Sequence, residues 1–456
     1  MVDGRWNMVD RLRERGLGNG KWGDLYIVIL LVIFGGIVLH APLTVWLSSN
    51  FPDCILFIKS WKEILMLVAS FIAIYLLYKY KKFNVLKNPL ILTIIAYAVL
   101  HLVLLFINNQ GLMPSLAGLI IDLRYLLFFV LVYVAIQLFP DKKSLFLKVG
   151  IAGALVVVIF AVLQVFVLPK DFLSVFGYGE NTIAPYLTID QSQDYIRINS
   201  TLRGPNPLGA YMLIVLALAF SAFANKKVKK TKKSLIIFLI LVFGSLIALW
   251  FSYSRSAMLG VAIALAVIFL VKFFNKLSIK NWLTIGAVFV IGAGGLFTMR
   301  NTDFISHVVL HENPSEGNNV NSNEGHINSL DNSLGEVISN PLGDGVGSTG
   351  SASLLGDDSK VVESQYLMVA HETGWLGLAY FLSIYTLVLW QLWNKKKDWL
   401  SLGVFASGIG LAVIGLFLPV FADDTVSIVW WGLAGLVIGG KWYTVDSRKQ
   451  KTIIKE

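Results

Sequence analysis

The chain has 456 residues, of which 56% are hydrophobic and only 14% are charged. Soluble domains are closer to half apolar and a quarter charged, so this composition excludes an ordinary soluble protein. The net charge of +10 does not indicate a nucleic-acid partner, because the basic residues lie in the connections between apolar blocks. The single cysteine, Cys54, excludes an intrachain disulfide and any metal site built from several cysteines.

The apolar residues come in blocks of about 20, the length at which a helix crosses a bilayer. The alternation expected of a β-barrel is absent. No small-residue cleavage signature follows the first block, so it is expected to be an uncleaved span and not a signal peptide. We predict an all-α polytopic membrane protein with about twelve transmembrane helices, at 25–47, 61–79, 89–107, 116–139, 149–168, 206–224, 234–252, 256–274, 281–299, 375–394, 399–418 and 426–442.

The distribution of Lys and Arg orients these spans. With the N-terminus in the cytoplasm, all but nine of the 38 basic residues fall on the inner side, as the positive-inside rule requires. Both termini are therefore predicted to be cytoplasmic. The expected organisation is a cytoplasmic N-terminus (1–24), nine spans over 25–299 with an outer loop at 169–205, a large extracytoplasmic loop (300–374), three more spans over 375–442 and a cytoplasmic tail (443–456).

The nine exceptions are informative, because an outer or intramembrane cation is not needed for orientation and is costly within a span. Lys59 and Lys62 are expected to reach the membrane interface with their long side chains. Arg124 lies within the fourth predicted span, and Asp122, two residues away, does not share its helix face. Arg124 could line a lipid path or form a structural ion pair. The other exceptions are Lys170, Arg197, Arg203, Arg255, Arg300 and Lys360.

The first outer loop ends in DYIRINSTLRGPNPLGAYM. Pro205 and Pro207 are typical of a helix entrance, and Asn206 is a candidate N-cap. With Arg203 just before them, the unpaired N–H groups of the helix start and a guanidinium would point to one place. This is the pattern of an anion site.

The second outer loop is too long for a simple connector. Within it, Ile327, Leu330, Leu334, Val337 and Ile338 repeat at helical spacing and predict a short surface helix, with His326 at its start. Asn340-Pro341 ends this helix, and a glycine-rich turn follows. Glu363 begins a short amphipathic turn before the tenth span. Taken alone, it is better explained as a solvated loop acid than as a catalytic residue, and His371 as a residue that caps or packs.

Four motifs in order resemble the O-antigen ligase and polysaccharide polymerase superfamily. They are STLRGPNPLG, SYSRSAMLG, GH…NPLGDGVGS and ESQYLMVAHETGWLGL. The resemblance covers most of the chain from Leu116 onward. It implies a GT-C-like glycosyltransferase of the cytoplasmic (inner) membrane that uses neither cofactor nor metal. The donor would be an undecaprenyl-pyrophosphate-linked glycan, and the reaction would occur on the extracytoplasmic side.

The resemblance also assigns roles to residues. Arg203 and Arg255 would hold the donor pyrophosphate, because the planar guanidinium of arginine binds two phosphate oxygens at once. From their positions in the sequence, we expect Arg197 and Asn206 to take part in the same site. Ligases carry a histidine, thought to be the catalytic base, where this chain has Glu363, which is more similar to polymerases. His326 lies in a GH element also found in such polymerases, so the base could be either residue.

The favoured interpretation is a polymerase of lipid-linked repeat units for O-antigen, capsule or exopolysaccharide. A ligase that transfers the glycan to a separate acceptor is the alternative. A flippase for the same lipids is less favoured, because two similar halves with broken helices are not apparent, and a membrane scaffold would leave the outer arginines unexplained. Expected partners are the bilayer, the lipid-linked glycan, and a flippase and a chain-length regulator, with no nucleic acid.

Overall fold

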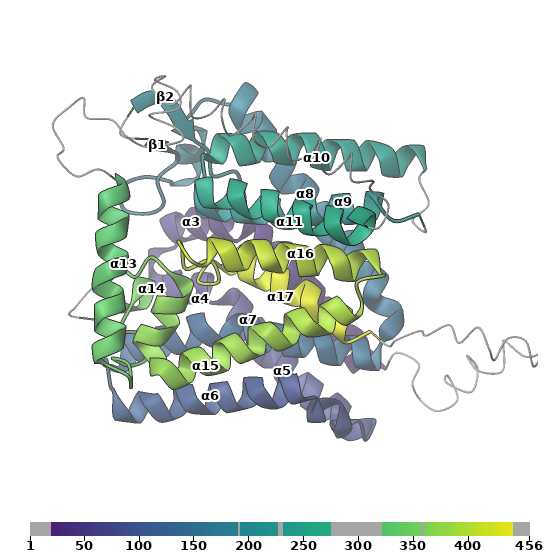
Figure 1. The fold of residues 1–456 in the computed structure, drawn as a ribbon, viewed down its shortest axis with the longest axis vertical. Helices are drawn as coiled ribbons and strands as arrows, with labels where there is room; N and C mark the ends of the chain where they lie inside the picture. The colour runs from purple at the N-terminus through teal and green to yellow at the C-terminus, as the bar shows by residue number, and fades with distance from the viewer. Residues whose placement is uncertain (1–19, 190–191, 227–230, 275–321, 357–359, 441–456) are drawn as a thin grey trace, which may run out of the picture.

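The computed structural model describes residues 20–189, 192–226, 231–274, 322–356 and 360–440 (Figure 1). Within them the protein is a bundle of helices that run side by side, with one two-stranded hairpin at an end of the bundle. The all-α polytopic class is confirmed. Nine helices of the described part are long and apolar enough to cross a membrane, and α16 and α17 are shorter apolar helices.

The elements follow one another in a simple order. The membrane helices are α2 (Lys21–Gly36), α3 (His40–Asn50), α5 (Trp61–Lys79), α6 (Pro89–Ile107), α7 (Leu112–Leu138), α8 (Lys143–Phe166), α9 (Pro205–Phe223), α10 (Lys232–Ser252), α11 (Arg255–Phe273), α15 (Gln365–Asn394), α16 (Trp399–Ile414) and α17 (Asp424–Ile438). The smaller elements are η2 (Ile37–Leu39), η3 (Pro52–Cys54), α4 (Ile55–Lys59), η4 (Phe83–Lys87), η5 (Pro140–Lys142), η6 (Phe172–Phe176), β1 (Leu187–Ile189), β2 (Ser192–Arg197), α13 (Ser322–Ser339) and α14 (Gly350–Ser353).

These helices coincide with eleven of the twelve predicted spans, and the ninth, 281–299, lies outside the described residues. The first span is one continuous apolar segment built from α2, η2 and α3. The tenth predicted span starts near Trp375, whereas α15 starts ten residues earlier and breaks at Gly374, which has a φ of 66°. The positive φ favours glycine at this break.

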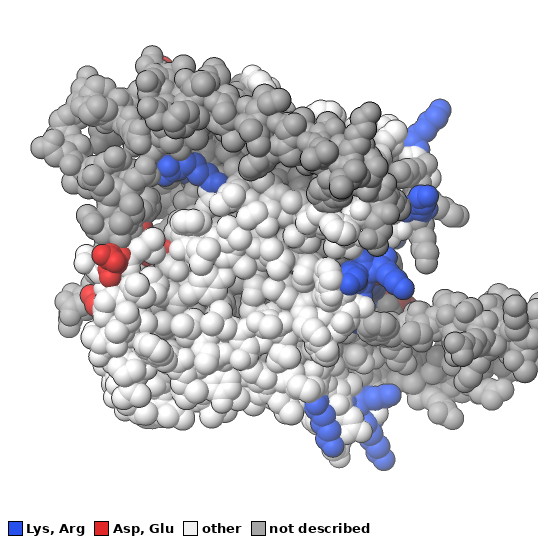
Figure 2. Space-filling model, viewed as in Figure 1, with Lys and Arg blue, Asp and Glu red and all other residues white. Residues whose placement is uncertain are grey.

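The polar elements gather at one end of the bundle. In Figure 1 the β1–β2 hairpin, α13 and α14 lie at the left, and α13 stands across the ends of the membrane helices. In the same view Asp and Glu are visible at the left, while most of the visible Lys and Arg project at the right (Figure 2). The two ends of the bundle therefore differ in both structure and charge.

The surface helix predicted in the second outer loop is present as α13, but it differs in two respects. It begins at Ser322, so His326 lies inside it and not at its start. Its predicted apolar face is only partly buried: Val337 is buried, whereas Leu334 and Ile338 are exposed. The indole N–H of Trp375 donates to the carbonyl of Val337 at 2.8 Å, which attaches α13 to the start of the tenth span.

The centre of the bundle is formed by α7 and α17. Trp430 and Trp431 of α17 are fully buried, and their rings lie 5.0 Å apart in an edge-on arrangement. Phe421 and Tyr385 pack against both rings. Glycines allow the two helices to approach closely, as is usual between membrane helices. At Gly435 an added Cβ would lie 2.7 Å from the backbone oxygen of Phe129.

We predict that Gly435→Leu destabilises the protein, because the side chain would meet the backbone of α7, which cannot move aside. Overpacking of this kind costs about 1–3 kcal/mol. The measurement is the thermal unfolding midpoint of the purified protein in detergent. Gly335→Leu is the matched control, since Gly335 is helical but has open space around its Cβ position. Equal midpoints for the two variants would contradict the close α7–α17 contact.

Candidate active site

A polar cavity of about 370 Å³ lies at the end of the bundle that carries α14 and the β-hairpin. It is enclosed by the first turns of α7 and α9, by α14, by the first part of α15, and by the loop between α16 and α17. Five charged or amide side chains are among its lining residues: Asp122, Arg203, Asn206, Glu372 and Asp423. One cation and three carboxyl groups thus line the same cavity, which has the size that small ligands occupy.

The cationic wall is built at the start of α9. Gly204 is the N-cap and Pro205 the first helical residue, so Asn206 is not the cap that the sequence suggested. The two prolines carry no N–H, and Leu208 donates to the oxygen of Gly204 at 3.1 Å. The first turn therefore offers an anion little more than the N–H of Asn206. The positive charge at this wall comes from Arg203 and only weakly from the helix end.

Arg197 connects three elements beside this wall. Its Nη2 donates to Oδ1 of Asn206 at 2.7 Å, and its Nε donates to the oxygen of Ser252, the last residue of α10, at 2.9 Å. Burial, followed by the charge of Arg255, lowers the pKa of Arg197 to about 10, so it stays protonated at neutral pH. Arg255 is the first residue of α11. The structure thus brings Arg197, Asn206 and Arg255 together, with Arg203 on the cavity side of Asn206.

The anionic wall depends on the glycine-rich loop after α13. The N–H groups of Gly347 and Thr349 donate to the carboxylate of Glu372 at 3.1 and 3.2 Å, and the Thr349 hydroxyl donates to it at 2.5 Å. At Gly347, which has a φ of 86°, a Cβ would lie 2.1 Å from the oxygen of Pro114. Gly345 is enclosed in the same way against Asn108. The NPLGDGVGS motif therefore holds Glu372 through its backbone.

The other two carboxyl groups are fixed by different partners. Asp122 lies 3.4 Å from Nε2 of the buried His101 and is in hydrogen-bonding contact with Glu372. Asp423 caps α17 by accepting from the N–H of Val426 at 2.9 Å. Burial raises the pKa of Asp423 above its ordinary value, and the charges of Arg203 and Arg124 act in the opposite direction. Asp423 thus lines the cavity as a carboxyl group that holds a proton more strongly than it would in water.

Glu363 lies close to this cavity but does not line it. It is half-buried in the extended segment that precedes α15. The next two residues attach that segment to the cavity wall: Ser364 Oγ and the Gln365 N–H both donate to the oxygen of Gly415, at 3.2 and 2.9 Å. Gln365 Oε1 also accepts from the N–H of Phe421 at 2.8 Å. For His326 the backbone belongs to α13, and its side chain lies outside the described residues.

His371 packs against α13 and the glycine-rich loop, in agreement with its interpretation as a packing residue. Its Nε2 lies 2.9 Å from Oδ2 of Asp344 and 3.4 Å from Oε2 of Glu336, and its Nδ1 lies 3.3 Å from the hydroxyl of Ser348. Glu336 also forms an ion pair with Lys360, which lowers the pKa of its carboxyl. These contacts join α13, the glycine-rich loop and α15.

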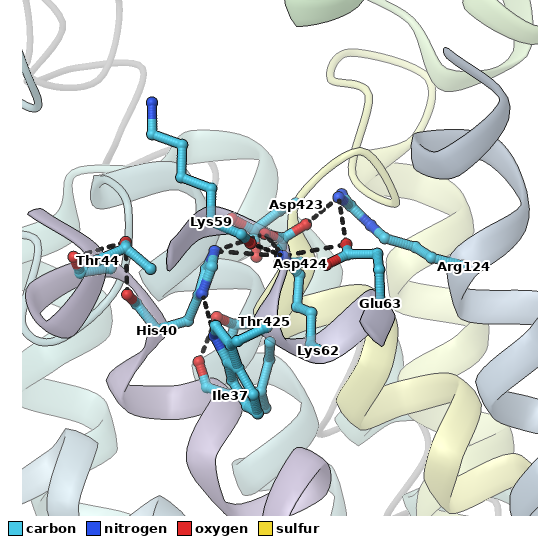
Figure 3. A network of polar contacts seen from close by, with 12 residues as sticks. Ile37, His40, Thr44, Lys59, Lys62, Glu63, Arg124, Asp423, Asp424 and Thr425 are labelled. Carbon is cyan, nitrogen blue, oxygen red and sulfur yellow. Dashed lines mark hydrogen bonds and ion pairs between the residues drawn. The ribbon is translucent and has the colours of Figure 1, made fainter. Parts of the chain in front are cut away.

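Arg124 belongs to a buried ion network next to the cavity (Figure 3). It forms an ion pair with Asp424, lies 3.9 Å from Oε1 of Glu63 and donates to the oxygen of Ala422 at 2.5 Å. Lys62 lies 3.1 Å from both Asp424 and Glu63. His40 Nε2 lies 2.9 Å from Asp424. Two cations and two carboxylates balance within this network, so Arg124 has the structural ion pair that was one of its two interpretations.

Sequence reasoning missed the three carboxyl groups of the cavity. Asp122 had a signal, since an acid within an apolar span is costly and usually has a function. Glu372 stands in the quoted motif HETGW, next to His371, but its distance from Asp122 along the chain hides the contact. Asp423 follows an apolar block in the sequence FADDT. The sequence alone does not show which of the two adjacent acids lines a cavity.

The fold and this cavity define an α-helical membrane protein with a polar site at one end of its bundle. Residues 239–382 match the family model described as O-antigen ligase. This match, which spans about a third of the chain, supports the resemblance to the O-antigen ligase and polysaccharide polymerase superfamily and indicates an enzyme of the ligase or polymerase type. The match includes Arg255, Glu363 and Glu372, while Arg203 and Asn206 precede it. No curated protein matches the chain.

We predict that Arg124→Gln lowers the unfolding midpoint strongly, because it leaves the carboxylate of Asp424 without its closest cation. Breaking a buried pair on one side costs about 3–5 kcal/mol. Thermal unfolding of the purified protein measures the change, with Lys59→Gln as the control, since the Lys59 ammonium points away from the network in Figure 3. A normal midpoint combined with weaker binding of the lipid-linked substrate would instead support a lipid path at Arg124.

Proposed function

We propose that the chain is a membrane glycosyltransferase that polymerises undecaprenyl-pyrophosphate-linked repeat units into a surface polysaccharide. The observation that carries the proposal is the cavity that Arg203 and Asn206 line together with three carboxyl groups. A transfer from a lipid pyrophosphate needs both kinds of group: cations for the leaving pyrophosphate and a carboxylate for the proton of the acceptor hydroxyl.

In the proposed reaction the acceptor oxygen forms a bond to the anomeric carbon of the donor glycan while the bond from that carbon to the pyrophosphate breaks. The electron pair of the broken bond stays on the leaving phosphate, so negative charge grows there. Arg203 would bind this charge, and Arg255 would extend the positive region through Arg197 and Asn206. Arginine suits this task because its planar fork binds phosphate oxygens bidentately and stays charged.

Three residues are candidates for the base that takes the proton of the acceptor hydroxyl. The family resemblance suggests Glu363 and His326. Asp423 joins them because its carboxyl group lines the cavity together with Arg203. Glu363 has the advantage of standing where ligases carry a histidine, and its neighbours are bonded to the loop that bears Asp423. Glu363 would then reach the cavity when the acceptor sugar binds.

The site would face away from the cytoplasm of the inner membrane, with both termini inside. The support is the unequal charge of the two ends: the cavity lies at the end with α13 and the hairpin, away from most of the visible Lys and Arg (Figure 2). A ligase that transfers the glycan to a separate acceptor is the second candidate, favoured by the description of the matching family. Partner proteins such as a flippase and a chain-length regulator would follow from the polymerase function.

The test uses purified protein, an undecaprenyl-pyrophosphate oligosaccharide, and EDTA to examine the expected independence from metals. Wild type should give a ladder of products on a gel. Arg203→Ala and Arg255→Ala should slow it about tenfold or more, since a charge-assisted hydrogen bond contributes about 1.5–3 kcal/mol. Lys59→Ala, an outer cation that points away from the ion network, is the control and should leave the ladder unchanged.

The base is identified by comparing Glu363→Gln, Asp423→Asn and His326→Ala in the same assay. The variant that abolishes the ladder while the donor still binds carries the proton transfer. A ladder undiminished in Arg203→Ala would contradict the assigned phosphate site. A wild type that makes no ladder but transfers the glycan once to an added acceptor would replace the polymerase by the ligase.

A further inference from the structure

A second cavity, apolar and about 320 Å³ in volume, opens on the side of the bundle between α8, α9 and α10. Helix α8 packs against α2 and α10, whereas α9 packs against α10, α11 and α16, so a groove forms where α8 and α9 diverge beneath α10. Small residues keep it open, because their side chains do not fill the space between the helices. The small lining residues are Gly150, Ala154, Ala219, Ala222 and Ser234.

The groove leads from the membrane-facing surface to the core. At its rim Ile151, Phe223 and Leu235 are 42%, 42% and 45% exposed, while Val429 and Leu433 of α17 are buried among its lining residues. The remaining lining is almost wholly aliphatic or aromatic. A chain of methylene groups that enters from the bilayer would exchange lipid contacts for equally apolar ones and would fill a volume that is otherwise empty.

The groove and the polar cavity occupy different parts of α9. The polar cavity is lined by the first part of the helix as far as Ala210, and the groove by residues from Tyr211 to Phe223 at the last turn. The groove therefore continues along α9 to the end of the helix away from the polar cavity and needs an explanation of its own.

Lysines gather at the mouth of the groove. Lys232 and Lys233 are exposed and directly precede the lining residues Ser234 and Leu235. Lys148 is exposed between two lining residues of α8, and Lys143 lies about one turn before them. Among the described residues, these four lysines form no ion pair with an acidic side chain, unlike Lys142 beside them, which pairs with Asp141.

Lys395, at the same end of the bundle, has a structural role that the four lysines lack in the described part of the chain. Lys395 donates to the oxygens of Val437, Ile438 and Gly440 at 2.9, 3.2 and 3.0 Å, and so closes the end of α17. Burial, followed by the charge of Lys143, lowers the pKa of Lys395 to about 8. The ammonium groups of Lys143 and Lys395 thus repel each other, and an anion at the mouth of the groove would relieve this repulsion.

We propose that the groove binds one acyl chain of an anionic phospholipid, with the headgroup phosphate held by the lysines at its mouth. The apolar lining fits the chain, and the four lysines fit the negative headgroup. A zwitterionic phospholipid offers the same chain but gains little from the lysines. None of the residues that line the groove lines the polar cavity, so this site does not rest on the proposed glycan transfer.

The test is native mass spectrometry of the purified protein with added dioleoyl phosphatidylglycerol or dioleoyl phosphatidylcholine, which carry the same acyl chains. Wild type should retain phosphatidylglycerol preferentially. Lys232→Glu/Lys233→Glu should reduce its binding roughly tenfold or more, because each lysine near an anionic lipid surface contributes about 1 kcal/mol. Both lysines are exposed, so this variant is expected to fold normally.

Ala219→Trp, which fills the groove, should lose the bound lipid, whereas Leu246→Trp, on the exposed face of α10 outside the groove, should keep it. Lys81→Glu/Lys82→Glu, an exposed basic pair in another connection, is the charge control. Equal retention of the two lipids, or normal retention by Ala219→Trp, would overturn the proposal. A dimer mass that disappears in Ala219→Trp would overturn it in favour of a second copy of the chain.

Discussion

The ion pair between Arg124 and Asp424 joins the two central helices of the bundle, and much of the site depends on it. Inside a membrane no water is available to solvate an unpaired charge, so each charged group must find its partner within the protein. Asp424 begins α17, and Arg124 lies within α7. The pair therefore fixes how deep α17 sits against α7. The close glycine contact at Gly435 and the packed rings of Trp430 and Trp431 can form only at that depth.

Arg124 also fixes part of the cavity wall, through a hydrogen bond to the backbone. Its second nitrogen donates to Ala422, one residue before Asp423, so the loop between α16 and α17 is held where it lines the cavity. On the opposite side, the glycine-rich loop holds Glu372 with two N–H groups and a hydroxyl. Both walls are thus fixed by bonds that the protein makes with itself. A site held in this way can keep its charges in place while a substrate with the opposite charges enters.

The sequence was sufficient for the parts of the fold that depend on local composition. Apolar blocks of helical length placed the membrane helices, and the spacing of Leu330, Leu334 and Val337 indicated α13. It was insufficient where the outcome depends on contacts between distant segments. The start of α9 looked like a capped helix, but the amide of Asn206 serves Arg197, and the two prolines remove most of the free N–H groups. Leu334 and Ile338 have the right periodicity for burial, but no neighbouring element covers them among the described residues.

The candidate site likewise contains residues that could be predicted from the sequence and residues that could not. Arg203 could be selected from the sequence because an outer cation is unusual, and the structure puts it on the cavity wall. Asp122 and Glu372 could not be paired from the sequence, because 250 residues separate them and their contact exists only after α7 and α15 have packed at the same end of the bundle.

This arrangement of charge has a consequence for the proposed reaction. If the cavity held only arginines, the leaving pyrophosphate would stay bound after transfer, since nothing would compete for the cations. The charge of Arg203 acts on the carboxyl group of Asp423, so this group would compete with the pyrophosphate for the arginine. The carboxyl group could do this only as the carboxylate, so any proton that it takes from the acceptor hydroxyl would first have to pass to solvent. A cavity with both signs of charge is therefore suited to repeated turnover, which a polymerase and a ligase both need.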